Sequence, residues 1–487
     1  MARVTKRAVV AAMVGLAASA CLEADPGVVA IREEPPAAGT PEEQPAEPAA
    51  AAQLSRIPPG AENPATKRLL PGIPRGCAPS AGRTLWVEEG EKLTATLGCD
   101  TGAELAPGDL AMDALPDGAR FDESTFTLSW TPGLDQAAVY ELPVEVRATG
   151  ERGVVRIGVA DAFDRSGNRP LRSAESYTEE FGIPVVHLET DSISDEEYRK
   201  ATIVYRGRTY AAEAKHRGRT SMKYPKKSFT LKFPGAALFS DAHKGFYNRK
   251  KVVLITNFND NSSLRHRLGF DLWNAMDRSH LPVQTFSVVL YWNGRFHGIY
   301  TLADHIDDDY LALNGMPKEG GLYKAVEGDY QFSRASSDGR FHAGYEKKSG
   351  HPPQGERGAF DELQELLDVL ASSSSSTFAN LSRIANRQEF HDWWIFSTYI
   401  VGRDLVRKNL YLYREPGAGF RYIPWDLDGV FGQNYKTLRE KPDTDSDFSG
   451  RNVFFERLMD FSASRSEVER RYAEMLKGPF AASWLHG

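Results

Sequence analysis

Four side chains that can act on a hydroxyl group and bind a metal ion lie in one stretch of the sequence. Asp404 and Asn409 stand five residues apart, and Asp426 and Asp428 follow after two strand-like runs. An aspartate on a rigid loop can accept the proton of a substrate hydroxyl, and Mg²⁺ prefers hard oxygen ligands. The pattern therefore predicts Asp404 as the general base. It predicts Asn409, Asp426 and Asp428 as metal ligands for phosphoryl transfer.

The residues between these acids make the pattern more specific than one short motif. An isolated Arg-Asp-Leu-x-x-x-Asn run is common by chance, but here the runs NLYLYRE and FRYIPW follow it, and then DLDG. Protein kinases place their catalytic and metal-binding residues in this order. The alternative interpretation is that Asp404 caps a turn and that Asp426 and Asp428 are ordinary loop acids.

The segment from Ala214 to Phe233 concentrates positive charge within a strand–loop–strand pattern. Successive residues of a strand point to opposite faces, so one of Lys226 and Lys227 is expected to face a cleft and bind nucleotide phosphates. Arg217 is expected to neutralise phosphate charge beside it. The sequence has no GxGxxG or Walker motif, and a solvated basic face is the alternative. The basic residues are Lys215, Arg217, Arg219, Lys223, Lys226, Lys227 and Lys232.

Composition and the N-terminus indicate an exported protein that does not bind nucleic acid. The 487 residues carry a formal net charge of −7, which gives no basic footprint for nucleic acid. Residues 1–20 have a basic start and a short apolar run that ends in LAASAC, which resembles a bacterial lipoprotein signal with Cys21 as the lipidated residue. Ordinary cleavage after Ala20 is the alternative. Cys77 and Cys99 are predicted to form a disulfide, or else to be two buried thiols.

Changes in composition and hydrophobic pattern along the chain predict a multidomain protein. Residues 21–70 are rich in Pro, Ala and Glu and are expected to form an extended tether. Residues 71–160 alternate like a small all-β sandwich. Their motifs PDG, WTP and QAAVY resemble cadherin-like or Ig-like modules of bacterial surface proteins, with Trp130 and Tyr140 in the core. A linker is expected over residues 161–182, before a large domain over residues 183–487.

The large domain reads as an α+β fold with two lobes. Strands are expected over residues 183–188, 201–205, 228–233 and 252–256, and a helix over residues 263–276. Asn293-Gly294 marks a hairpin turn. Beyond Gly321 the pattern favours helices, at residues 360–370 and 388–400.

Several motifs of this domain together resemble the spore-coat protein H (CotH) family of atypical secreted kinases. They are HRGRTSMKYPKKSF, YWNGRFHGIYTLADHID, RDLVRKNLYLYRE and IPWDLDGVFG. The resemblance implies a kinase-like fold that uses ATP with Mg²⁺ (or Mn²⁺). It also implies that Asp404 is the catalytic acid, that Asp426 and Asp428 bind the metal, and that Lys226 or Lys227 meets ATP.

The chain departs from the family pattern at three positions. Arg219 and Gly402 each stand where the family usually has Asn, and Asp304 replaces a Glu that would reach a lysine. The chain stops soon after EMLKGPF, where relatives continue, so the C-terminal lobe is expected to extend further.

The sequence leads to one main hypothesis and two rivals. The main one is an atypical Ser/Thr kinase of the bacterial cell envelope, lipid-anchored to the membrane or secreted, whose partner is an exported protein substrate. The first rival is a kinase-like surface lipoprotein that serves in adhesion, since ATP is scarce outside the cytosol. The second is a metal-dependent phosphodiesterase. The oligomeric state stays open.

Overall fold

The computed structural model describes residues 84–97, 105–134, 136–160, 174–260, 262–326, 332, 344–372, 377–434, 438–439 and 452–485. The chain divides into two compact units, with the boundary between Val185 and Val186. The predicted signal peptide and tether, Cys21, and the pair Cys77 and Cys99 all lie outside the described residues. No helix in the described ranges combines the length and apolar character needed to span a membrane.

The described part of the first unit contains two β-sheets that share one hydrophobic cluster. Their strand orders are β1-β7-β6-β3 and β2-β5-β4. Alternate residues of β1, β2 and β5 are buried, as expected for strands with one face toward a core. Trp130 is 1% exposed and meets the edge of Tyr140 at 4.9 Å between ring centroids. The strands are β1 Thr84–Glu88, β2 Leu93–Thr96, β3 Leu110–Ala111, β4 Arg120–Asp122, β5 Thr127–Trp130, β6 Ala138–Val146 and β7 Glu151–Ala160.

A closed barrel forms the first half of the second unit. Seven strands follow the order β10-β11-β12-β15-β17-β16-β9, and β9 also pairs with β10, which closes the ring. Aromatic and branched side chains fill the interior as a separate hydrophobic cluster. The strands are β9 Ile183–Glu189, β10 Arg199–Tyr205, β11 Arg208–Arg217, β12 Ser228–Lys232, β15 Lys251–Thr256, β16 Thr285–Trp292 and β17 Arg295–Asp304. The four strands predicted here are present, and Asn293-Gly294 forms the predicted turn between β16 and β17.

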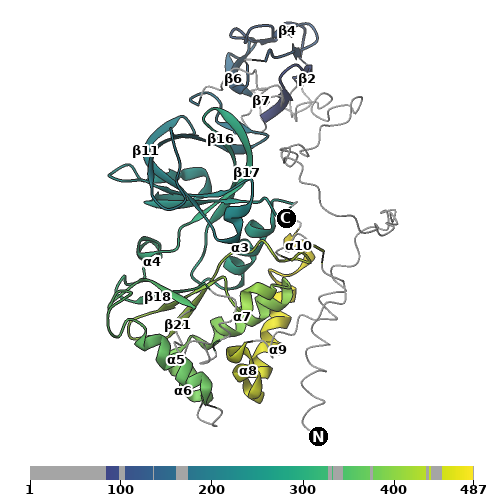
Figure 1. Cartoon of the computed structure of the whole chain (residues 1–487). Coiled ribbons are helices and arrows are strands. Elements are labelled where there is room, and N and C mark those ends of the chain that lie inside the picture. The colour runs from purple at the N-terminus through teal and green to yellow at the C-terminus, as the bar shows by residue number, and fades with distance from the viewer. Residues whose placement is uncertain are drawn as a thin grey trace, which may run out of the picture. The chain divides into compact units, whose positions relative to one another are not determined.

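The second half combines a four-stranded sheet with helices (Figure 1). The sheet has the order β19-β18-β20-β21, where β18 is Gly321–Ala325, β19 Tyr345–Ser349, β20 Leu410–Arg414 and β21 Phe420–Pro424. The strand-like runs NLYLYRE and FRYIPW are present as β20 and β21, but strands β18 and β19 were not expected in the stretch beyond Gly321. Both strands depend on pairing with the distant β20 hairpin, so local periodicity did not reveal them. The helices are α4 Asp308–Leu313, α5 Asp361–Ala371, α6 Thr377–Ile384, α7 Arg387–Tyr399, α8 Val453–Asp460, α9 Ser462–Lys477 and α10 Ala482–Leu485.

Helix α3, Arg265–Met276, joins the barrel to this helical half. It begins two residues later than predicted. Its buried residues Phe270, Trp273 and Met276 belong to the same hydrophobic cluster as α5, α7 and the β20–β21 hairpin. One continuous core therefore runs from the outer face of the barrel into the helical half, and it holds the barrel and the predicted catalytic stretch in one unit.

Candidate active site

The loop that carries Asp404 is anchored to the buried helix α7. A 3₁₀ turn, Arg403–Val406, follows α7 and contains Asp404. Trp393 of α7 donates its indole N–H to the Leu405 carbonyl at 3.2 Å. Lys408 places its Nζ 3.5 Å from Asp404 Oδ2. Because Leu405 is buried and tied to the helix, the Asp404 carboxylate stands on a rigid support, as a general base requires.

The β20–β21 hairpin brings the other predicted residues back to this loop. The Trp425 amide donates to the Asn409 carbonyl at 3.0 Å, where the hairpin closes. Asp426 has a φ of 60°, a left-handed conformation that is uncommon for a residue with a Cβ. The pKa of Asp428 is raised to about 6, first by burial and then by the carboxylates of Asp426 and Asp404. The three predicted acids therefore lie close enough to interact.

Two polar residues from the barrel side contact the acids Asp426 and Asp428. Asn259, in the loop after β15, donates its Nδ2 to Asp428 Oδ2. His266 of α3 places Nε2 3.7 Å from Asp426 Oδ1. Although burial opposes ionisation, His266 and the lysines 324 and 408 hold the pKa of Asp426 below its usual value. Asp426 and Asp428 are neighbouring carboxylates with different pKa values, and the Asn259 side-chain amide lies beside them. These oxygen atoms fit a hard divalent cation.

Two cations face these acids from opposite halves of the unit. Arg217, at the end of β11, lies over Trp425 with its guanidinium carbon 5.1 Å from the ring centroid. Its Nη1 is buried and has no hydrogen-bond partner in the described part of the chain. Lys324, on β18, has a pKa lowered to about 8 by burial and by Arg217. The Arg217 Nη1, buried and without an acceptor among the described residues, fits a phosphate chain beside a metal site.

Lys226 and Lys227 both contact Tyr300, Lys226 through its ammonium group and Lys227 through its backbone carbonyl. Lys226 donates to the Ile299 carbonyl at 2.7 Å and lies 4.3 Å from the Tyr300 ring centroid. Its pKa is lowered to about 8 by burial. Tyr300 belongs to the interior cluster of the barrel, so Lys226 is oriented to that interior. For Lys227, the described contact is through its backbone carbonyl, which accepts from the Tyr300 hydroxyl at 3.0 Å.

Two of the three departures from the family pattern have structural partners. Asp304 is 2% exposed and pairs with Arg249 through Nε and Oδ1 at 2.7 Å. It also accepts from the Gln284 amide at 2.8 Å. The shorter carboxylate is therefore satisfied by Arg249, the last residue of the short strand β14 (Phe246–Arg249), instead of by a lysine. Arg219 donates to the Val326 carbonyl at 3.0 Å, which links the loop after β11 to the end of β18.

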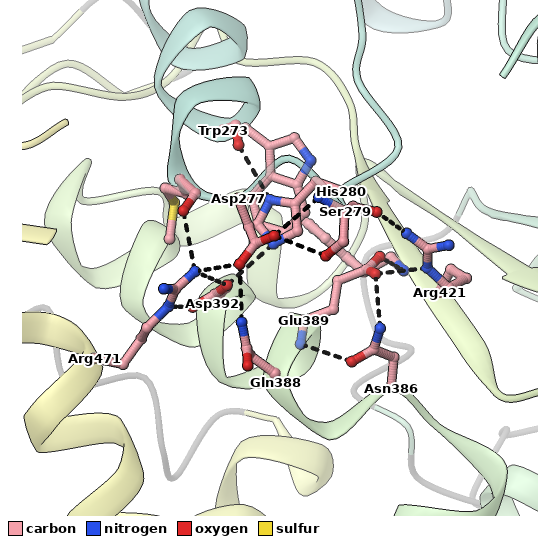
Figure 2. Close-up of polar contacts among 12 residues, drawn as sticks. Trp273, Asp277, Ser279, His280, Asn386, Gln388, Glu389, Asp392, Arg421 and Arg471 are labelled. Atoms are coloured by element: carbon pink, nitrogen blue, oxygen red, sulfur yellow. Dashed lines mark hydrogen bonds and ion pairs between the residues drawn. The ribbon is translucent and has the colours of Figure 1, made fainter. Parts of the chain in front are cut away.

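Buried ion pairs hold the elements around the site in place (Figure 2). Asp392 of α7 binds Arg471 of α9 at 2.9 Å and His280 at 3.1 Å. The His280 ring stacks on Trp273, with centroids 3.9 Å apart. These contacts join α7, which leads to Asp404, to α3 and α9. The same helix is tied through Glu389 and Arg421 to β21, which leads to Asp426.

Sequence reasoning missed Asn259, His266, Lys324 and Lys408. Lys408 lies within the quoted catalytic motif and was overlooked, although its i,i+4 spacing from Asp404 was a usable signal. The other three come from distant segments. The polar run NFNDN at residues 257–261 follows a strand directly, which was the signal for Asn259. Lys324 had no local signal because its strand was not predicted.

A base-bearing loop, paired acids for a metal and the two cations Arg217 and Lys324 define a site suited to phosphoryl transfer. A family model described as CotH kinase protein matches residues 214–487, more than half of the chain. The chain therefore belongs to the CotH kinase protein family. This family suggests a kinase-like phosphotransferase that uses ATP and a divalent metal ion. No curated protein matches the chain.

Proposed function

We propose that this protein is an exported atypical kinase that transfers the γ-phosphoryl group of ATP to a Ser or Thr hydroxyl of an envelope or extracellular protein. The observation that carries the proposal is that the hairpin after the Asp404 loop leads to two neighbouring acids. His266 lies 3.7 Å from Asp426, and Asn259 donates a hydrogen bond to Asp428. The N-terminal sequence, with its basic start, apolar run and Cys21, supports export and a lipid anchor.

The residues fit ATP with a divalent metal ion. Asp426 and Asp428, with Asn409, offer the oxygen ligands that Mg²⁺ or Mn²⁺ prefers. Arg217 offers a buried nitrogen that lacks a partner in the described residues, which suits a phosphate oxygen. Bound ATP would supply the phosphoryl group, and the metal ion would offset its negative charge.

Asp404 would orient the substrate hydroxyl and accept its proton as the new O–P bond forms, while the bond between the γ-phosphorus and the bridging oxygen breaks and ADP leaves. Lys408, 3.5 Å from Asp404, orients the carboxylate. Arg217 neutralises charge on the phosphate chain. His266 and Asn259 hold the Asp426 and Asp428 carboxylates in position from the barrel side.

The test is phosphoryl transfer from γ-labelled ATP to an exported protein fraction. Asp404→Asn should lower transfer by about 10²- to 10⁴-fold while Mg·ATP still raises the melting temperature of the protein. Asp308→Asn removes an exposed aspartate of α4 and is the matched control, which should keep the wild-type rate. Transfer by Asp404→Asn at the wild-type rate would refute the role of Asp404.

The adhesin hypothesis makes the opposite prediction for nucleotide. A binding lipoprotein with a kinase-like fold would show no Mg·ATP-dependent rise in melting temperature, because stabilisation requires a ligand that binds the folded state. Such a protein would bind surface polymers instead. The tether and β-module suit either function, so the thermal-shift titration separates the two.

A further inference from the structure

Lys324 occupies an unusual position for a charged side chain. It lies in the interior of the helical half's sheet, on β18, in register with Tyr411 of β20 and Glu346 of β19. Its Nζ lies 5.6 Å from the Tyr411 ring centroid. Within the described ranges, no hydrogen bond or ion pair is formed by this ammonium group. The side chain is only partly buried, so this ammonium group remains available to an anionic ligand.

Arg217 repeats the pattern from the barrel side. It stands at the end of β11, where its guanidinium group packs on Trp425, next to Asp426 in the chain. Its Nη1 is buried and unpartnered among the described residues. Trp425 and Tyr411, the rings beside which Arg217 and Lys324 lie, have centroids 6.0 Å apart. Burial and then Arg217 lower the pKa of Lys324, while Asp426 stabilises the charge of both cations. Glu346 is a second acidic neighbour of Lys324, whereas the buried Arg217 Nη1 has no acceptor among the described residues.

An anion with several oxygens would give acceptors to both the Lys324 ammonium group and the Arg217 Nη1. A phosphate chain offers enough acceptors for the free guanidinium nitrogen and for the ammonium group, and charge-assisted hydrogen bonds are the strong ones. The adjacent acids would hold the metal ion that such a chain carries. The two cations come from β11 and β18, so one ligand would contact both halves of the unit.

Lys226 offers a contrast within the same chain. Its ammonium group already has an acceptor, the Ile299 carbonyl at 2.7 Å, and an aromatic face, Tyr300. A Cβ at position 298 would lie 3.1 Å from Lys226 Nζ, so Gly298 leaves the space that this lysine occupies. The surroundings of Lys226 are complete without a ligand, whereas those of Lys324 are not.

We propose that Lys324 and Arg217 are the pair of cations that binds the polyphosphate chain of the nucleotide, and that Lys226 is a structural lysine of the barrel. This assignment rests on the proposed kinase function. It replaces a contact from the PKKS segment by one from β18, more than 90 residues further along the chain.

The experiment measures binding by calorimetry with inorganic tripolyphosphate, Mg·ATP and adenosine as probes. Lys324→Met should weaken tripolyphosphate and Mg·ATP binding by about 10- to 100-fold, because it removes one charge-assisted contact. Adenosine has no phosphate, so its affinity should be unchanged. Lys324→Arg should retain most of the phosphate affinity. Lys226→Met is the matched control, a second partly buried lysine, and should bind all three probes as the wild type does.

The melting temperature without ligand gives a readout that is independent of binding. Lys324→Met should melt at about the same temperature as the wild type, because this partly buried ammonium group makes no hydrogen bond or ion pair within the described residues. Lys226→Met should melt lower, because it leaves the Ile299 carbonyl without its donor.

The outcomes separate this inference from the kinase function. Equal tripolyphosphate and Mg·ATP affinity in the wild type and Lys324→Met would overturn the assignment, as would a selective loss of phosphate affinity in Lys226→Met. A wild-type protein that binds both phosphate probes through Lys324 but transfers no phosphoryl group would leave the assignment intact and refute the kinase function instead.

Discussion

Replacing Arg421 by Met tests how the core positions the metal-binding loop. Arg421 lies on β21, and its Nε pairs with Glu389 Oε2 of α7 at 2.7 Å. Glu389 is 1% exposed, and its other oxygen accepts the Tyr422 amide at 2.6 Å. The variant would leave a buried carboxylate without its counter-charge, and it would also leave the Ser279 carbonyl without a donor (Figure 2).

The expected cost follows from these contacts. Breaking a buried ion pair by removing one partner costs about 3–5 kcal/mol. The Tyr422 amide still donates a hydrogen bond to the carboxylate, so we expect a loss of about 3 kcal/mol in the free energy of unfolding. The double variant Glu389→Gln/Arg421→Met should recover about 1–2 kcal/mol of this loss, because the buried charge is then gone.

The pH dependence supplies a second check. Burial raises the pKa of Glu389 above its usual value even beside Arg421, and loss of Arg421 should raise it further. A carboxyl group with a raised pKa destabilises the fold when ionised, so the penalty in Arg421→Met should shrink as the pH falls below that pKa. The double variant should not show this recovery.

The assay is urea denaturation of Arg421→Met, Glu389→Gln, the double variant and the wild type, with hydrogen exchange of the β21 amides to locate the effect. Exchange at β21 should quicken in Arg421→Met, and the metal response of the Asp426 loop should weaken with it. A cost below about 1 kcal/mol, or single-variant costs that add in the double variant, would refute this reasoning.

Two further predictions follow from the site. The nucleotide affinity of the wild type should fall from about pH 7 to about pH 9, because Lys324, surrounded by Arg217, Asp426 and Glu346, has a pKa near 8 and loses its charge there; calorimetry should find no such fall in Lys324→Arg. Gly269→Ala should weaken Mn²⁺ binding, measured by titration, since the new Cβ would lie 2.6 Å from Leu427 Cδ1, between the two metal-binding aspartates. The clash should cost about 1–3 kcal/mol, partly offset by about 1 kcal/mol of helix propensity, and unchanged Mn²⁺ affinity would contradict the assignment of that loop.

Much of the fold could be predicted from local pattern. The helical spacing of Leu268, Leu272 and Met276 identified α3, and the Asn293-Gly294 turn identified the β16–β17 hairpin. These signals are local, because helix periodicity and turn type depend on neighbouring residues. Strands β18 and β19 were missed. Their stability comes from pairing with β20, and that pairing is not encoded within the short runs themselves.

The sequence by itself determined the acids of the candidate site. Asp404, Asp426 and Asp428 lie within one short stretch, and a single hairpin is enough to bring its two ends together. Tertiary structure alone decided what faces these acids. Asn259 and His266 come from segments whose approach depends on the barrel and on the packing of α3, and Lys324 is brought in by the pairing of β18 with β20. The tertiary structure also decided which predicted cation faces the acids. The strand and loop geometry turns Lys226 toward Tyr300 and leaves Arg217 beside Asp426. Side-chain direction at a strand end depends on the neighbouring strands, and a single sequence does not contain that information.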